Sequence, residues 1–148
     1  MRYLIPPEKV QARVRELAAQ ISAEYRGKTP LFVGVLKGAF VFLADLIRAT
    51  ELDNLWVDFL AVSSYGDATV HSGEVQILKD LSVSVEGRHV ILVEDIVDTG
   101  LTLRYLRQLL LDRQPASLRI CVLLDKKERR EVEVPVDYVG FEIPDAFV

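Results

Sequence analysis

Apolar and polar positions follow one another along the chain in a pattern that predicts helices alternating with short strands. Between residues 7 and 25, apolar side chains recur every three or four positions behind Pro6 and Pro7, which is typical of an amphipathic helix. Further helices are expected at 39–49 and around Leu103, Leu106 and Leu110. Apolar runs typical of strands occupy residues 31–36, 55–62, 75–78, 90–93, 118–124 and 138–143.

Near-continuous apolar strands separated by helices predict an α/β fold, with a parallel twisted sheet flanked by helices on both faces. The chain has no internal repeat and no Gly/Ser linker, so residues 1–148 are expected to form a single domain. Ligands of such sheets bind at the carboxyl ends of the strands. Three such ends carry chemically different residues, at 37–38, 63–65 and 94–102, and residues 65–74 have the composition of a long mobile loop.

Composition narrows the classes of function. Half of the 148 residues are hydrophobic, 27% are charged, and the formal net charge is −4, which argues against a broad nucleic-acid-binding surface. The apolar runs are too short for a membrane span, and the first residues lack the apolar core of a signal peptide. A single cysteine, Cys121, fits a reducing compartment. We therefore expect a cytoplasmic protein with no nucleic-acid partner and no membrane partner.

The segment richest in candidate chemistry is VILVEDIVDTGLT, residues 90–102. Its apolar residues predict a buried strand, which ends at the acidic pair Glu94 and Asp95. A turn at 98–100 then leads into a helix, whose N-terminus and hydroxyl groups suit a phosphate monoester. Carboxylates beside that phosphate can bind ribose hydroxyls and Mg²⁺. The alternative is that Asp98 and Thr99 merely cap the helix while the acidic pair is solvated.

VEDIVDTGLT closely resembles the phosphoribosyl-diphosphate-binding motif of the type I phosphoribosyltransferases. It is most similar to the form found in hypoxanthine (hypoxanthine–guanine) phosphoribosyltransferases. The segments LFVGVLKGAFVFLADLIR, VDFLAVSSYG, VQILKDL, ICVLLDKKERR and YVGFEIPDAFV resemble that family's blocks in order and spacing. The LLDK and GFEIPDAFV segments narrow the resemblance to enzymes that act on 6-oxopurines. The implied architecture is the type I phosphoribosyltransferase fold, with a small hood formed by the chain ends.

The resemblance implies roles for the residues of the motif. Asp98 would be the general acid/base for the proton on purine N7. Glu94 and Asp95 would contact the ribose hydroxyls and the magnesium shell, and Ile96 and Val97 belong to the same substrate-binding motif. The 5-phosphate would be held by Thr99, Gly100, Leu101 and Thr102.

Other residues of the family pattern lie on separate segments. Lys37 and Gly38 would bind the diphosphate, next to a Leu36–Lys37 peptide bond that is often cis in this family. Lys126 would donate to the purine 6-oxo group. Phe147 would stack on the base, Val148 would bind the base through its backbone, and Ser64 and Tyr65 would begin a loop that closes over the reactants.

Less specific interpretations stay open beside these roles. Lys37 would otherwise be a solvated lysine, and Phe147 an apolar residue that closes the core. We interpret residues 127–131, in the charged run after Lys126, as a solvated turn. His71 is expected to be an exposed loop residue, and His89 and Cys121 to be structural.

The chain departs from the family pattern after Val148. Members of the family continue with a tail that supplies an aspartate near the purine and an arginine for the diphosphate, and neither has a counterpart here. We expect the sequence to be part of a longer chain. Without that tail, diphosphate and metal binding would weaken.

The resemblance thus implies a purine salvage enzyme that uses Mg²⁺ and forms a homodimer or homotetramer. It would transfer the phosphoribosyl group from phosphoribosyl diphosphate to hypoxanthine or guanine, which yields IMP or GMP and diphosphate. One alternative is a nucleotide-sensing regulator that uses the same fold without turnover. Asp98→Asn separates the two, because an enzyme would lose turnover while a sensor would hardly change. A xanthine-preferring enzyme is a further alternative.

Overall fold

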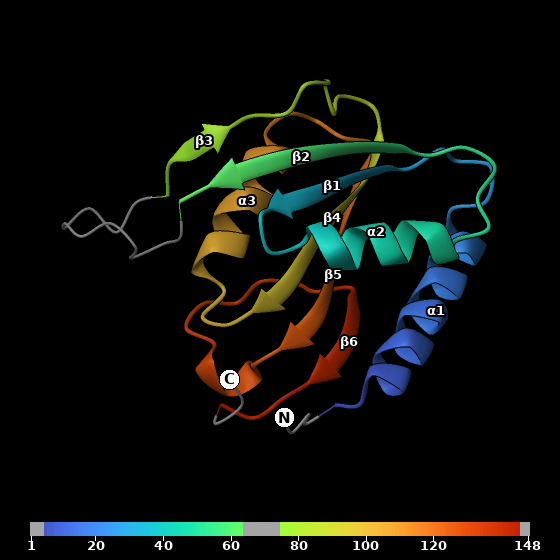
Figure 1. Ribbon diagram of the computed structural model, residues 1–148. Coiled ribbons are helices and arrows are strands. Elements are labelled where there is room, and N and C mark those ends of the chain that lie inside the picture. Colours follow the sequence, from blue (N-terminus) through green and yellow to red (C-terminus); the bar gives the residue numbers. More distant parts are fainter. Residues whose placement is uncertain (1–4, 64–74, 146–148) are drawn as a thin grey trace.

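The computed structural model describes residues 5–63 and 75–145, which form one six-stranded sheet with helices on both faces (Figure 1). The strand order is β3-β2-β1-β4-β5-β6. The strands are β1 (Leu31–Leu36), β2 (Trp56–Val62), β3 (Ile77–Lys79), β4 (His89–Val97), β5 (Ser117–Asp125) and β6 (Tyr138–Glu142). The helices are α1 (Pro7–Glu24), α2 (Phe40–Ala49), α3 (Leu101–Leu111) and the 3₁₀ turn η1 (Lys127–Arg129).

The two central strands define where a ligand can bind. β1 pairs in parallel with both β2 and β4, and the parallel series continues through β5 to β6. After β1 the chain returns through α2 to β2, whereas after β4 it returns through α3 to β5, on the opposite side. The connections therefore diverge above the adjacent carboxyl ends of β1 and β4, which is the arrangement that opens a binding crevice in parallel sheets.

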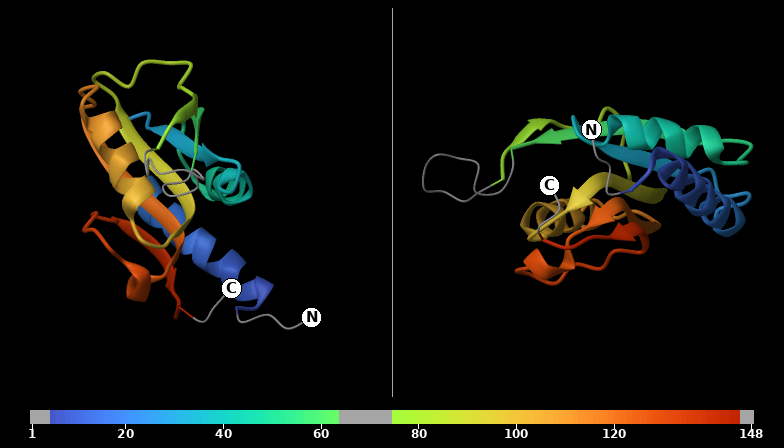
Figure 2. Two further views of the ribbon diagram at one scale, coloured as in Figure 1. Left: turned by 90° about the vertical axis from the view of Figure 1, so that its left-hand side faces the viewer. Right: turned by 60° about the horizontal axis from the view of Figure 1, so that its bottom comes forward.

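Alternating strand residues build a separate core on each face of the sheet. Phe32, Ile91 and Val93 pack with buried residues of α1 and α2. Leu31, Val33 and Leu92 face the other way and pack with buried residues of α3. Figures 1 and 2 show α1 and α2 together on one face and α3 on the opposite face. This arrangement confirms the prediction of a sheet covered on both sides and explains why its strands read as nearly unbroken apolar runs.

Segments from the two ends of the chain meet at the β6 edge of the sheet. Arg13 of α1 donates from Nε to the carbonyl oxygen of Gly140 at 2.9 Å and from Nη2 to that of Val139 at 2.7 Å. Charged donors on an edge strand use carbonyl groups that would otherwise face solvent. The early helix and the last strand therefore support each other.

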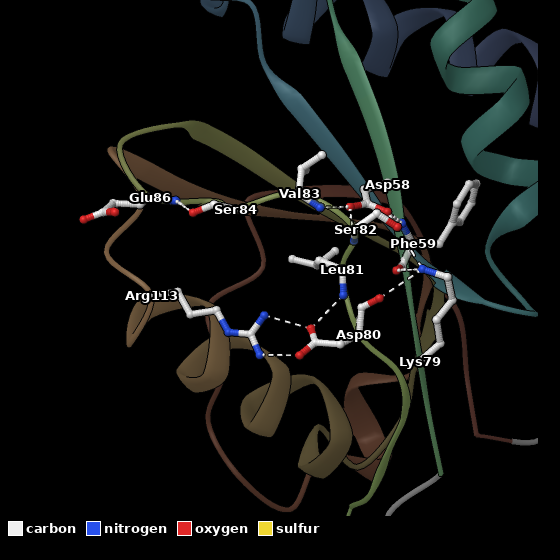
Figure 3. A network of polar contacts seen from close by, with 10 residues as sticks. All are labelled: Asp58, Phe59, Lys79, Asp80, Leu81, Ser82, Val83, Ser84, Glu86 and Arg113. Carbon is white, nitrogen blue, oxygen red and sulfur yellow. Dashed lines mark hydrogen bonds and ion pairs between the residues drawn. The ribbon is translucent and has the colours of Figure 1, made fainter.

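A polar network fixes the segment that follows β3 (Figure 3). The buried carboxylate of Asp58, on β2, accepts hydrogen bonds from the backbone N–H groups of Ser82 and Val83 at 2.8 and 3.0 Å. Arg113, just beyond α3, donates both of its terminal nitrogens to the two carboxylate oxygens of Asp80 at 2.8 Å. Residues 80–83 are therefore tied both to β2 and to the end of α3.

The elements lie where the hydrophobic pattern predicts them, with three differences. β4 continues to Val97 instead of ending before the acidic pair, because residues up to Val97 pair with β5. β3 pairs antiparallel with β2, in a sheet that is otherwise parallel. The run expected at 75–78 forms a strand only at Ile77–Lys79. The loop expected at 65–74 lies outside the described residues. Among the described helices, none has the length and apolar character needed to cross a membrane.

Candidate active site

A cleft of about 560 Å³ opens at the carboxyl ends of β1 and β4, where the chain connections diverge. Its walls come from the end of β1 and the following turn, from β4, from the start of α3 and from η1. The residues that line it are Val35, Leu36, Lys37, Gly38, Val62, Glu94, Asp95, Ile96, Val97, Asp98, Thr99, Gly100, Thr102, Leu103 and Arg129.

The turn after β1 lies directly against the acidic pair of β4. The Leu36–Lys37 peptide bond is cis, as the family resemblance implies. A Cβ atom placed on Gly38 would lie 3.1 and 3.2 Å from the two carboxylate oxygens of Asp95, which is tighter than ordinary packing. Glycine at this position therefore allows the backbone to approach a carboxylate closely, and it brings Lys37 and the acidic pair into one cleft.

The acidic pair differs in its environments. Burial, together with the negative charge of neighbouring Asp95, raises the pKa of Glu94 to about 8. Glu94 Oε1 also accepts a hydrogen bond from the backbone N–H of Asp95 at 3.1 Å. A cation or a pair of hydroxyl donors in this part of the cleft would stabilise the charged form of Glu94. The pair is therefore suited to a ligand that brings positive charge or hydrogen-bond donors.

The turn between β4 and α3 presents the N-terminus of a helix to the cleft. Gly100 is the N-cap residue and has φ of 88°, a left-handed conformation that glycine adopts without strain. Leu101 donates its N–H to Thr99 Oγ1 at 3.3 Å. The N-terminus of a helix favours an anion through its N–H groups and its dipole. A phosphate site at this end of α3 stays a prediction.

The segment after β5 holds that turn in place. Thr99 accepts backbone hydrogen bonds from Glu131 at 2.8 Å and from Val132 at 3.3 Å. Arg130 forms an ion pair with Asp125, a carboxylate that is only 2% exposed, and its Nε donates to the carbonyl oxygen of Asp98 at 3.3 Å. The turn is therefore fixed by backbone contacts and by one buried charge pair.

Asp98 lies between the acidic pair and the start of α3, with one oxygen enclosed by protein. Arg129 approaches it, and its Nε lies 2.7 Å from Asp98 Oδ1. The approach is ionic and not an aligned hydrogen bond, because Oδ1 is buried without a hydrogen-bond partner in residues 5–63 and 75–145. Arg129 therefore compensates the charge of one carboxylate oxygen, while the side chain of Asp98 as a whole stays 43% exposed in the wall of the cleft.

The structure brings most of the residues predicted for the site together. The cleft contains Lys37, Gly38, Glu94, Asp95, Ile96, Val97, Asp98, Thr99, Gly100 and Thr102. Leu101 and Lys126 adjoin it without lining it; the backbone N–H of Lys126 donates to the carbonyl oxygen of Val97 at 3.0 Å. Ser64, Tyr65, Phe147 and Val148 lie outside the described residues, and so does His71.

Two arginines of the site were missed when residues 127–131 were interpreted as a solvated turn. That interpretation is wrong for Arg130, whose side chain is only 19% exposed and pairs with buried Asp125. It is incomplete for Arg129, which is about half exposed but lines the cleft and contacts Asp98. The strand order could have indicated this position. Because β4 and β5 are parallel neighbours, a charged run at the carboxyl end of β5 lies beside the carboxyl end of β4.

The residues of the cleft fit a magnesium ion whose other ligands are the phosphate groups of a substrate. In the part of the chain that the structure describes, no three or more Asp, Glu, His or Cys side chains come together to enclose a metal. Mg²⁺ is usually held by one or two carboxylates together with substrate phosphates and water. Glu94 and Asp95, in the same cleft as the start of α3, would provide such carboxylates.

Comparison with known proteins assigns the chain to a family. Residues 7–148 match the phosphoribosyl transferase domain model. The chain belongs to this family of transferases. Within it, the relatives are hypoxanthine and hypoxanthine-guanine phosphoribosyltransferases, which are purine salvage enzymes.

The similarity extends over nearly all of this chain. The hypoxanthine-guanine phosphoribosyltransferase of Bacillus subtilis is 51% identical over 147 residues, which cover 99% of this chain and 81% of the relative. The hypoxanthine phosphoribosyltransferase of Haemophilus influenzae is 50% identical over 148 residues, covering 98% of this chain and 82% of the relative. A crystal structure of a hypoxanthine phosphoribosyltransferase from Staphylococcus aureus aligns with a TM-score of 0.92 at 44% identity, covering 99% of this chain and 79% of that one.

Proposed function

We propose that this chain transfers the 5-phosphoribosyl group from phosphoribosyl diphosphate to N9 of hypoxanthine or guanine, with Mg²⁺ and with Asp98 as the general acid/base. The products are IMP or GMP and diphosphate. Membership of the family and the names of the relatives support the reaction class and the type of base. The assignment of roles to residues rests on the cleft itself.

The observation that carries the role of Asp98 is its place in the cleft, where Arg129 contacts one carboxylate oxygen and 43% of the side chain stays exposed. The residue lies in the cleft wall, between the acidic pair and the helix N-terminus. A purine bound there would donate from N7–H to the carboxylate oxygen that Arg129 does not hold. In the reaction, N9 forms its bond to the anomeric carbon while the bond from that carbon to the diphosphate breaks, and the carboxylate of Asp98 takes the proton from N7.

The other residues of the cleft bind and orient the reactants. Backbone N–H groups and hydroxyls of residues 99–102 hold the 5-phosphate at the start of α3. Glu94 and Asp95 accept hydrogen bonds from the ribose hydroxyls and would hold Mg²⁺, which when bound would supply charge neutralisation for the diphosphate. Lys37 and the backbone at Gly38 bind the diphosphate. Holding both substrates in line converts the encounter into an effectively unimolecular step.

Recognition of the base would come from residues that are not among those lining the cleft. Lys126, which follows β5, would donate to the 6-oxo group of the purine. Phe147 would stack on the ring and Val148 would bind its edge, while Ser64 and Tyr65 would begin the segment that covers the reactants. These assignments rest on the family pattern in the sequence, except that the position of Lys126 at the end of β5 agrees with it.

A diphosphate-release assay tests the proposal. The chain is offered phosphoribosyl diphosphate and Mg²⁺ with hypoxanthine, guanine, xanthine, adenine or uracil in turn. We expect turnover with hypoxanthine or guanine, none with adenine or uracil, and loss of activity with EDTA that added Mg²⁺ reverses. Turnover only with xanthine would show that the proposed preference for hypoxanthine or guanine is wrong. No release of diphosphate with any base, together with tight GMP binding, would support the alternative of a nucleotide sensor.

The proposal extends to the assembly and the compartment of the protein. A homodimer or homotetramer is supported by exposed apolar residues close to the cleft, Phe40 and Val41, each 56% exposed at the start of α2. Sedimentation equilibrium would measure the oligomeric state directly. A cytoplasmic location is supported by a single, buried cysteine, which is typical of proteins from reducing compartments.

A further inference from the structure

Arg129 lines the cleft, although it belongs to a charged run that was interpreted from the sequence as a solvated turn. Its guanidinium makes two ionic contacts, from Nε to Asp98 Oδ1 at 2.7 Å and from Nη1 to Asp145 Oδ1 at 3.5 Å. Asp98 lies after β4 and Asp145 lies after β6, so the side chain bridges two separate segments at the carboxyl edge of the sheet.

The backbone that carries Arg129 is fixed against the turn that carries Asp98. Within η1, the N–H of Arg129 donates to the carbonyl oxygen of Lys126 at 3.0 Å. Two residues later, the N–H of Glu131 donates to the carbonyl oxygen of Thr99 at 2.8 Å. This short segment is therefore tied at one end to the residue that follows β5 and at the other to the turn beside Asp98. The guanidinium is thus presented from a rigid base.

We propose that Arg129 is a positioning residue that fixes the orientation of the Asp98 carboxylate for proton transfer with the purine. This inference rests on the proposed function. The ionic contact engages Oδ1, which is enclosed by protein, and restrains rotation of the carboxylate. The other carboxylate oxygen is left to take the proton, on a side chain that is 43% exposed and lines the cleft.

A purely structural role does not account for this contact. The side chains of Arg129 and Asp98 are 47% and 43% exposed, and ion pairs in such positions add little to the free energy of unfolding. The structural charge pair of this segment is the neighbouring one, between Arg130 and buried Asp125. Removal of Arg129 should therefore change the reaction rate and leave the melting temperature nearly unchanged.

A direct role in binding substrate makes a different prediction. A guanidinium that bound the diphosphate or the 5-phosphate would lower the KM for phosphoribosyl diphosphate, and it would do so whether or not Asp98 is present. A residue that acts through Asp98 loses its effect when Asp98 is replaced, because coupling between two positions appears only when both partners are intact.

The test is a double-mutant cycle on the full chain, with R129Q, D98N and the combined variant. We expect R129Q to lower kcat about 10- to 100-fold, as misplacement of a catalytic group does, with little change in the KM for phosphoribosyl diphosphate. In the D98N background the same substitution should change kcat less than about twofold. Only effects of Arg129 that do not act through Asp98 can remain in that background. R129K should recover part of the lost rate, since it keeps the charge without the planar fork.

Two further measurements complete the cycle. GMP affinity, measured by calorimetry, and the melting temperature should be nearly equal in R129Q and the unsubstituted chain. R26Q, at an exposed arginine beyond α1, serves as the matched control and should leave every parameter unchanged. An equal loss of kcat from R129Q with and without Asp98, or a rise in the KM for phosphoribosyl diphosphate with unchanged kcat, would overturn the inference. Absence of turnover in the unsubstituted chain would instead overturn the proposed function, and the inference with it.

Discussion

Gly38 lies so close to Asp95 that a Cβ atom on the glycine would come within 3.1 Å of the carboxylate. The two residues belong to different strand ends, since Gly38 follows β1 and Asp95 lies near the end of β4. Their contact joins the turn proposed to bind diphosphate to the pair proposed to hold magnesium. The lack of a side chain at position 38 is therefore a condition for the geometry of the cleft.

Gly38→Ala should consequently impair catalysis more than folding. The added methyl group has to displace the Asp95 carboxylate by a few tenths of an ångström, and small misplacements in a reacting site can cost up to about 100-fold in rate. We expect a decrease in kcat/KM for phosphoribosyl diphosphate and a higher Mg²⁺ concentration for half-maximal activity. Steady-state kinetics over a magnesium titration measure both. An unchanged magnesium dependence in the Gly38→Ala variant would show that the contact has no part in metal binding.

Asp58→Ala should destabilise the fold, because the backbone N–H groups of Ser82 and Val83 would lose their buried acceptor. Each donor left unsatisfied costs about 1–3 kcal/mol, so we expect the free energy of unfolding to fall by at least that amount. Urea denaturation measures the change. Asp80→Ala is the matched control in the same network (Figure 3). It removes an exposed pair with Arg113, and such pairs contribute about 0–1 kcal/mol. Equal losses in the two variants would contradict the distinction.

Arg130→Ala should be far more destabilising than Arg129→Ala, although the two residues are adjacent. The first substitution leaves the carboxylate of Asp125, 2% exposed, without its cation, and an uncompensated buried charge costs about 3–5 kcal/mol. The second removes a half-exposed pair worth about 0–1 kcal/mol.

Chemical denaturation of both variants measures this difference. Asp125→Asn combined with Arg130→Ala should recover much of the stability lost in Arg130→Ala, because the buried charge is then gone. A failure of the double variant to recover would mean that packing of Arg130 against Gly100 matters more than its charge.

Cys121 should resist thiol reagents as long as the protein is folded. Burial raises the pKa of its thiol to about 12, so almost none of the reactive thiolate is present near neutral pH. The folded state holds this proton more tightly than the unfolded chain does. The contribution of Cys121 to stability is therefore constant below about pH 9 and falls as the pH rises toward 12.

Reaction with a chromogenic disulfide reagent in native buffer and in urea measures this protection. We expect labelling of about one thiol per chain only under unfolding conditions, with a rate in native buffer that follows the global opening of the fold. Fast labelling of the native protein would show that β5 opens locally.

The sequence predicted the sheet and its helices well because apolar periodicity depends on burial, which the sequence records directly. It predicted the acidic pair, Asp98 and the turn at 98–100 because they are contiguous in the chain. The end of β4 was placed too early because Glu94 and Asp95 are polar, although Glu94, Ile96 and Val97 still pair with β5. Polarity marks where a strand meets solvent or a ligand, and this need not be where its hydrogen bonding stops.

The roles of the two arginines could not be read from their local pattern. In the sequence, Arg129 and Arg130 belong to one charged run. In the structure, one lines the cleft and the other neutralises a buried carboxylate. The difference depends on the direction in which each side chain leaves a single 3₁₀ turn, and therefore on packing between β5 and the turn after β4.

The strand order also constrains how the chain acquires its structure. The two central strands come from distant parts of the sequence, since Leu31 of β1 pairs with Val90 of β4, and β2 and β3 are synthesised between them. Loop closure over such a separation must be completed before the cleft exists, which favours slow, topology-limited folding. An emerging chain can complete β1, α2 and β2 early, but it has no substrate site until β4 docks beside β1. Acquisition of ligand binding during refolding should therefore report on formation of the β1–β4 pair, and not on the appearance of helical signal.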